Sequence, residues 1–273
     1  MVEDINKKIY YLGENKDFSD RWLIKVLKEN FQVILIKPDT NYELKWNADY
    51  IVNRLYVSAY ERYNKRKIDK LLSLIKKLGK AKQINSSKGF LLEYNRIKQF
   101  KFFIANNVPF VPTRALANID SIKSLNFPIV IKKNHSGRNK EIDIINKYSD
   151  LKKFSSSLYK TKITQELIKE KKCYRTEFIG DSLLTFPQEI HIRNNKLKFK
   201  YIPKIVKTPL SSKLIKKIRY SLEKIGVRVF SIEYFIKNNN ISIIDFNLSS
   251  NYKPFLIKQK GEVIKKAWLN LFK

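Results

Sequence analysis

The sequence predicts an α+β fold in which a βαβ-type N-terminal lobe precedes two further lobes of helices and antiparallel strands. Three observations lead to this prediction. Strand and helix patterns alternate in the first third, Pro109 and Pro112 mark a connector, and strand patterns follow one another closely in the second half. A chain of 273 residues is long enough for two or three lobes of ordinary size. This order excludes a TIM barrel and a single doubly wound sheet.

The first lobe is expected to cover residues 1–94. An apolar strand over residues 8–13 precedes a helix that begins near Ser19, and a second apolar strand covers residues 31–38. The remaining elements of this lobe are a strand at 49–54, an amphipathic helix through 71–79 that Gly79 ends, and a strand at 82–85. Together these elements predict a layered βαβ unit.

The second lobe is expected to cover residues 95–168. Its first helix starts at Asn95, and the two prolines then exclude helix from the connector at residues 108–113. The later elements are a short helix at 118–125, a strand at 127–133, a polar loop at 134–140, a strand at 141–145, a helix from Ser149 and a strand at 162–168.

The third lobe is expected to cover residues 169–273. Gly180 and Asp181 form a turn signal between two strand patterns, which indicates a hairpin. The later elements are a strand at 197–202, a helix at 211–226 that Gly226 ends, a strand hairpin at 231–247 and a last Lys-rich helix.

The formal charge of +31 raises the question of nucleic-acid binding. Lysines are spread along the whole chain as helix faces, far outnumber arginines, and accompany no helix-turn-helix, zinc or RNA-binding aromatic signature. We therefore disfavour nucleic acid as a partner, although a basic nucleic-acid-binding protein stays an alternative. An acidic partner such as an Asp/Glu-rich peptide or a polyphosphate is favoured electrostatically.

Several classes are excluded by composition. A hydrophobic content of 43% argues for a folded chain, and no apolar run approaches the roughly 20 residues that a membrane span needs. The amino terminus contains acids and lacks the long apolar core of a secretory signal, so we expect a cytoplasmic protein without a membrane partner. A lone Cys173 forms no internal disulfide, and with only two histidines a zinc site is disfavoured.

The hairpin at residues 231–247 carries the most informative pattern. Period-2 geometry places Asp245 and Asn247 on one face, and pairing across a loop of residues 238–240 sets Glu233 opposite Asp245. Two carboxylates and an amide are hard oxygen donors of the kind that Mg²⁺ uses beside nucleotide phosphates. The alternative is that Glu233 is a solvated strand residue and the other two open a turn.

A second pattern lies at residues 127–145, where a strand ends in Lys132 and a loop holds Ser136 and Gly137. Such a loop can place backbone N–H groups around phosphate oxygens, although a solvated surface hairpin is the alternative. Because Lys132 shares a strand face with Val130, its ammonium is expected on the buried face.

The order of these elements resembles the ATP-grasp superfamily, in particular its carboxylate-amine ligases that extend protein tails or cyclise ribosomal peptides. The resemblance rests on the Lys-ended strand and its loop, the segment ITQELI, the strand CYRTEFIGD and the hairpin ending in DFN, and it extends over nearly the whole chain. It implies a pre-grasp lobe followed by two α+β lobes that sandwich the nucleotide.

The resemblance also implies roles for individual residues. Nucleotide-binding positions would be Arg96, Lys132, Ser136, Gly137, Gln165, Glu166, Leu167 and Ile168, of which the last four form the hinge whose backbone meets adenine. Lys98 is a neighbouring candidate to Arg96. The catalytic cations would be Arg175 and Lys132, and the Mg²⁺ ligands would be Glu233, Asp245 and Asn247.

The implied reaction uses ATP and Mg²⁺ to phosphorylate a carboxylate, and an amine or hydroxyl then attacks the acylphosphate. The implied substrate is an amino acid or an acidic peptide, and the sequence leaves open a homodimer and the choice between amide and ester. Departures from the family pattern at Asn139, Glu141 and Cys173 support an alternative, a catalytically degenerate protein that binds nucleotide or an acidic peptide without turnover.

Overall fold

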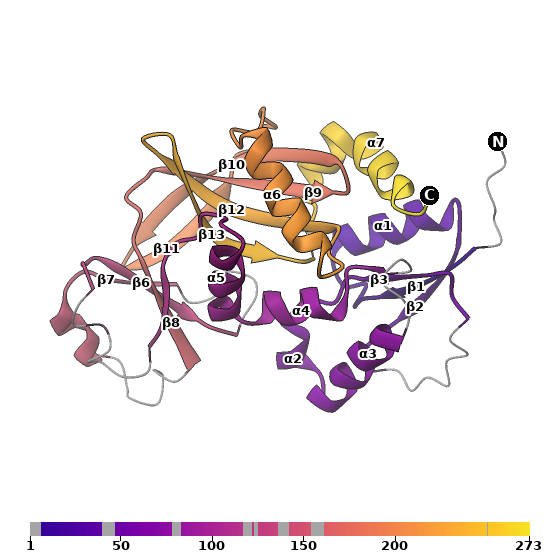
Figure 1. Cartoon of the computed structure of the whole chain (residues 1–273), viewed down its shortest axis with the longest axis horizontal. Coiled ribbons are helices and arrows are strands. Elements are labelled where there is room, and N and C mark those ends of the chain that lie inside the picture. Colours follow the sequence, from indigo (N-terminus) through magenta and orange to yellow (C-terminus); the bar gives the residue numbers. More distant parts are fainter. Residues whose placement is uncertain are drawn as a thin grey trace.

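The computed structural model describes residues 7–39, 47–77, 83–116, 122, 125–135, 142–153, 161–249 and 251–273. A small sheet and a large sheet lie beside one another along the long axis of the molecule (Figure 1). The predicted α+β class is confirmed by the order of helices and strands. Gly79 and most of the helix expected at 118–125 lie outside the described residues.

Four parallel strands form the small sheet in the order β2-β1-β3-β4. They are β1 (Lys8–Leu12), β2 (Gln32–Ile36), β3 (Tyr50–Asn53) and β4 (Gln83–Ile84). The helices of this lobe are α1 (Phe18–Lys28), α2 (Ala59–Arg62) and α3 (Lys65–Lys77). All residues from Ile9 to Leu12 are buried, as expected for a parallel strand that is covered on both faces. The predicted βαβ unit is confirmed.

Two consecutive helices, α4 (Ser87–Tyr94) and α5 (Arg96–Ala105), lead from the small sheet to the large one. The sequence analysis predicted α5 with its start at Asn95 and missed α4. Gly89 explains the miss, because glycine within a helix is unfavourable and weakens the pattern. A Cβ at this position would lie 2.4 Å from Val227 Cγ2 and 2.8 Å from Leu248 Cδ1, so only glycine allows α4 to pack this closely.

The large sheet has nine strands in the order β13-β12-β9-β10-β11-β7-β6-β8-β5. They are β5 (Thr113–Ala115), β6 (Ile129–Lys133), β7 (Asp143–Ile145), β8 (Lys162–Glu166), β9 (Lys172–Ile179), β10 (Ser182–Arg193), β11 (Lys196–Tyr201), β12 (Val229–Lys237) and β13 (Asn240–Asn247). A 3₁₀ helix, η3 (Tyr148–Lys153), stands where a helix from Ser149 was expected.

The large sheet has two halves that are joined narrowly. Strands β5 to β8 pair among themselves and strands β9 to β13 do the same, whereas β11 and β7 pair only at Lys196 and Asp143. These halves correspond to the second and third lobes of the sequence analysis. The proposed boundaries at residues 94/95 and 168/169 remain predictions.

The predicted hairpin turn between β9 and β10 is present. Ile179 pairs with Ser182, and Gly180 between them has a φ of +52°, in the left-handed region that favours glycine.

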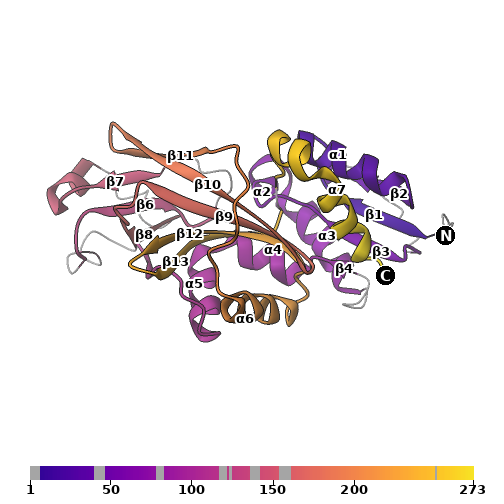
Figure 2. The same ribbon diagram turned by 90° about the horizontal axis from the view of Figure 1, so that it is seen from above.

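Helices cover both faces of the half that contains β9 to β13. On one face, Phe230 packs in a core with α5 and with α6 (Ser212–Glu223), while its neighbour Val229 faces a second core that contains α7 (Pro254–Asn270). Figure 2 shows α7 beside α1 of the first lobe. The C-terminal helix therefore ties the third lobe back to the first. Among the described residues, no helix combines the length and the apolar character that crossing a membrane requires.

Candidate active site

The hairpin of β12 and β13 pairs as the sequence predicts, with Glu233 opposite Asp245. The turn is shorter than expected. Asn238 and Asn239, with φ of +48° and +62°, form it, and Asn240 already belongs to β13. Asparagine tolerates positive φ better than other residues with a side chain, which is why two residues suffice for this turn.

A β-bulge interrupts the hairpin beside the two carboxylates. Glu233 pairs with Asp245, but the next pair is Tyr234 with Ile243, so Ile244 is an extra residue in β13. A bulge of this kind leaves a backbone group without its ladder partner and often lies next to an active site. Here it leaves the carbonyl of Ile244 available to a side chain.

Lys132 uses this carbonyl. Its Nζ donates a hydrogen bond to Ile244 O at 3.1 Å, and its side chain is buried on the same face of β6 as Val130, as predicted. Burial lowers the pKa of Lys132 to about 8, although the carboxylate of Asp245 acts in the opposite direction. The lysine is thus held at the carboxylate hairpin by a strand of the other half of the sheet.

Two arginines lie against the carboxylates of the hairpin. Arg175 Nη1 donates to Glu233 Oε1 at 2.9 Å, and its Nε donates to Glu177 Oε1 at 2.7 Å. Arg96 Nε lies 3.3 Å from Asp245 Oδ1. These two arginines and three carboxylates are all buried. Because water does not solvate their charges there, the opposite charges stabilise one another. Three predicted cations and two predicted metal ligands therefore meet in one place.

The predicted adenine-binding segment lines a pocket between the two halves of the large sheet. Residues Gln165 to Ile168 share this pocket with Lys132, Glu233 and Asp245, which lie close to one another. The other lining residues are apolar: Val130, Ile142, Leu197, Phe199, Phe235 and Ile244. A largely apolar pocket with a cluster of charged groups suits a flat aromatic ring with a charged tail.

One backbone group and one side chain of this segment make hydrogen bonds within the protein. Leu167 N donates to Pro128 O at 3.2 Å, and Gln165 Nε2 donates to Thr113 Oγ1 at 2.9 Å. These contacts fix the segment on β6 and β5.

A larger cleft adjoins the pocket on the other side of Glu233. It is lined by Asn247, the third predicted metal ligand, and by residues of the first lobe such as Tyr56 and Ser58. Among the described residues, Asn247 Nδ2 is buried and has no hydrogen-bond partner. The described residues contain no group of three or more His, Cys, Asp or Glu that could hold a metal, because the third member of the predicted set is an amide.

In the loop expected to bind phosphate, Ser136 and Gly137 lie outside the described residues. Its first residue is well anchored. Asn134 Oδ1 accepts from Ile97 N at 3.2 Å, and Arg96 Nη1 donates to Lys133 O at 2.9 Å. The start of the loop is thereby fixed to the beginning of α5, which carries Arg96.

Glu93 lines the same cleft, and the sequence analysis missed it. It lies near the end of α4, and its Oε2 accepts from Leu248 N at 3.0 Å. Burial raises the pKa of Glu93 to about 8, and the charge of Asp245 acts in the same direction. No local signal marks this residue. The segment of α4 has no clear amphipathic pattern, so its sequence does not distinguish a buried glutamate from a solvated one.

The raised pKa of Glu93 predicts a pH-dependent stability. Folding favours the protonated form, so its contribution is fully present below the unfolded pKa of 4.5 and is lost as pH rises toward about 8. Glu93→Gln removes this dependence. We measure the free energies of unfolding of the variant and the wild type in urea. The variant's value minus that of the wild type should increase by a few kcal/mol from pH 5 to pH 9, since one pKa unit corresponds to about 1.4 kcal/mol. A difference between the two proteins that is constant with pH would contradict the assignment.

Comparison with solved structures finds similar folds over nearly the whole chain. The ATP-grasp ligase PsnB in complex with a minimal precursor has a TM-score of 0.71 at 11% identity, covering 99% of this chain and 100% of that one. The macrocyclase MdnC from Microcystis aeruginosa, bound with precursor peptide MdnA, has a TM-score of 0.70 at 12% identity, covering 96% and 99%. A RimK domain ATP-grasp protein from Sphaerobacter thermophilus has a TM-score of 0.67 at 14% identity, covering 97% and 98%.

At the level of sequence, neither a family model nor a curated protein matches this chain. At identities of 11% to 14%, the similarity is one of fold.

Proposed function

Because this chain has the ATP-grasp fold, we propose that it is an ATP-dependent ligase that joins a carboxylate to an amine or a hydroxyl through an acylphosphate. The observation that carries the proposal is the meeting of Glu233 and Asp245 with Lys132, Arg96 and Arg175 at the junction of an apolar pocket and a polar cleft.

The pocket is the proposed nucleotide site. The adenine ring would lie against Gln165, Glu166, Leu167 and Ile168, with the phosphates extending toward Lys132 and Arg96. In this orientation the charged end of the nucleotide meets the buried cations, which contribute charge-assisted hydrogen bonds to phosphate oxygens.

The donor set fits Mg²⁺. Glu233, Asp245 and Asn247 offer only hard oxygen donors, two of them directly opposite one another on neighbouring strands. When bound, Mg²⁺ would neutralise charge on the phosphate oxygens of ATP. Glu233 lines both the pocket and the cleft, so this ligand lies between the proposed nucleotide and the proposed substrate.

The reaction would begin with attack of a substrate carboxylate oxygen on the γ-phosphorus of ATP, with ADP as the leaving group. Lys132, Arg96 and Arg175 would offset the negative charge in this step, which is mainly electrostatic in phosphoryl transfer generally. An amine or hydroxyl would then attack the acyl carbon and lose its proton, and phosphate would leave with the bonding electron pair.

The substrate is proposed to be an amino acid or an acidic peptide. The net charge of +31 favours an acidic partner. Among the similar structures, MdnC is bound with a precursor peptide and PsnB is in complex with a minimal precursor. The cleft beside Glu233 is the proposed place for this substrate in the present chain.

The test is an assay of ADP formation with Mg²⁺-ATP over a set of amino acids and acidic peptides, with hydroxylamine present in parallel samples. Hydroxylamine attacks an acylphosphate and forms a hydroxamate, so the proposed intermediate gives a product that can be measured. ADP formation that requires a carboxylate substrate and is accompanied by hydroxamate is the expected result. Binding of Mg²⁺-ATP without ADP formation on any of these substrates would favour the non-catalytic alternative.

A further inference from the structure

Lys253 occupies a position where its residue type is unfavourable. It is the N-cap of α7, and its side chain makes no capping hydrogen bond. Ser, Thr, Asp and Asn are preferred at this position because their oxygens accept from the first free N–H groups of a helix. A cation there also faces the positive end of the helix dipole. Departures from local preference of this kind are expected at functional or strained sites.

The surroundings of Lys253 are also unfavourable for a positive charge. Its side chain is half-buried and lines the cleft, with Nζ 4.5 Å from the centre of the Tyr201 ring. Burial and the neighbouring charge of Arg175 lower the pKa of this lysine. In the part of the chain that the structure describes, no carboxylate lies within ion-pair distance of Nζ, so its charge is offset only by the ring and by more distant acids.

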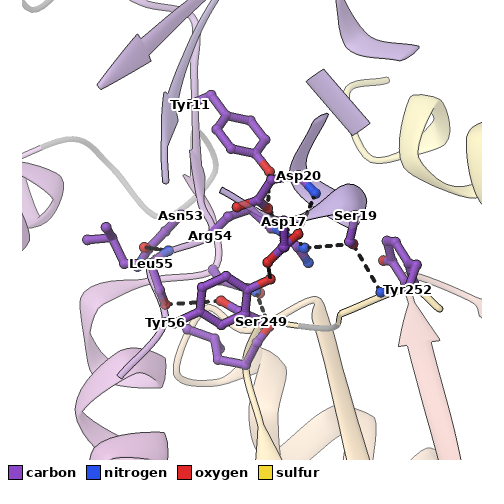
Figure 3. A network of polar contacts seen from close by, with 12 residues as sticks. Tyr11, Asp17, Ser19, Asp20, Asn53, Arg54, Leu55, Tyr56, Ser249 and Tyr252 are labelled. Atoms are coloured by element: carbon purple, nitrogen blue, oxygen red, sulfur yellow. Dashed lines mark hydrogen bonds and ion pairs between the residues drawn. The ribbon is translucent and has the colours of Figure 1, made fainter. Parts of the chain in front are cut away.

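Tyr252, the residue before Lys253, belongs to a buried network of polar contacts (Figure 3). Tyr252 N donates to Ser19 Oγ at 3.0 Å, and the Tyr252 hydroxyl accepts from Trp268 Nε1 at 2.8 Å. The guanidinium of Arg54 lies over the Tyr252 ring at 5.5 Å. Because the backbone N–H, the hydroxyl and the ring of Tyr252 each have a buried partner, the chain is fixed directly before Lys253.

The charges of the cleft are distributed unevenly. Lys253 and Arg175 lie close enough for their charges to act on one another, and the carboxyl groups of Asp17, Glu93 and Glu233 also line the cleft. An anionic group that enters is attracted to the two cations and repelled by the carboxyl groups that are ionised, and burial favours the protonated, uncharged form of Glu93. The adenine pocket is lined by Glu233 and not by Lys253, so the anion expected at Lys253 belongs to the substrate and not to the nucleotide.

We propose that Lys253, together with Arg175, binds a carboxylate of the substrate in this cleft and so selects for acidic substrates. This proposal rests on the proposed ligase function and assigns a substrate-binding residue that the sequence analysis did not name. Lys253 would act in binding, with Tyr201 and the Tyr252 anchor positioning its ammonium.

The test measures binding of an acetylated tetraglutamate peptide by calorimetry at 150 mM salt in the presence of Mg²⁺ and a non-hydrolysable ATP analogue. Removing one charge-assisted contact is expected to weaken binding by about 10-fold or more, so Lys253→Met should show this loss and Lys253→Arg should recover most of it. Lys258→Met, an exposed lysine further along α7, is the matched control and should bind as the wild type does. The tetraglutamine peptide should bind at least 10-fold more weakly to the wild type.

The melting temperature separates binding from structure. Because Lys253 opposes the helix dipole, Lys253→Met should melt at or above the wild-type temperature. A lower melting temperature, or equal binding of tetraglutamate to the variant and the wild type, would overturn the proposal. Binding of the nucleotide analogue without binding of tetraglutamate would also overturn it. So would a Lys253→Met variant that loses affinity for the analogue and keeps its affinity for tetraglutamate. Failure of the wild type to bind the analogue would instead contradict the proposed function.

Discussion

Glu233→Gln is expected to lower Mg²⁺-dependent ADP formation by at least about 100-fold, since a bound metal contributes several kcal/mol to charge stabilisation and 1.4 kcal/mol corresponds to a factor of ten. The side chain keeps its size, and Arg175 keeps its contact with Glu177. We therefore expect a folded protein with the melting temperature little changed. The measurement is the initial rate of ADP release at saturating ATP.

The matched control for this variant is Glu189→Gln on β10. The Glu189 side chain is 47% exposed and its carboxylate lies against His191, so its substitution should leave the rate unchanged. A Glu233→Gln protein that retains a rate within twofold of the wild type would contradict the assignment of Glu233 to the reacting site.

The second large effect concerns the buried ion pair of the first lobe. Arg54 donates to Asp20 Oδ1 from Nε at 3.2 Å and from Nη2 at 3.1 Å, and both side chains are fully buried (Figure 3). Tyr11 OH donates to the same oxygen at 2.7 Å. Arg54→Met leaves Asp20 without its counter-charge, and we expect the free energy of unfolding in urea to fall by about 3–5 kcal/mol.

Arg66→Met, on the exposed face of α3, is the control and should change stability by less than about 0.5 kcal/mol. Adding Asp20→Leu to Arg54→Met removes the unpaired charge and should restore part of the loss. If Arg54→Met alone were as stable as the wild type, the ion pair would not hold the segments that carry Asp17, Tyr56 and Tyr252 around the cleft.

Much of the fold follows from local sequence patterns. The apolar run of β1 and the helix after it predict the βαβ unit, Gly180 marks the hairpin of β9 and β10, and Asn95 marks the start of α5. The opposition of Glu233 and Asp245 follows from period-2 geometry and a short turn, because both depend only on neighbouring residues.

What the sequence could not provide depends on contacts between distant residues. The cost of a glycine in α4 is offset by Val227 and Leu248, more than a hundred positions away, which no local pattern indicates. In the sequence, Glu93 resembles a solvated residue. In the structure it is buried beside Leu248, and this burial raises its pKa. Lys253 looks like one more lysine in a Lys-rich chain, and its importance appears only from the cleft that it lines.

The central claim is that the hairpin of β12 and β13 binds a nucleotide through Mg²⁺, and the most direct measurement is calorimetric binding of a non-hydrolysable ATP analogue with Mg²⁺ or with EDTA. We predict binding with Mg²⁺ that weakens about tenfold or more in EDTA, and loss of this difference in the double variant Asp245→Ala with Asn247→Ala. No binding by the wild type, or the same affinity in EDTA and in the double variant as with Mg²⁺, would contradict the claim.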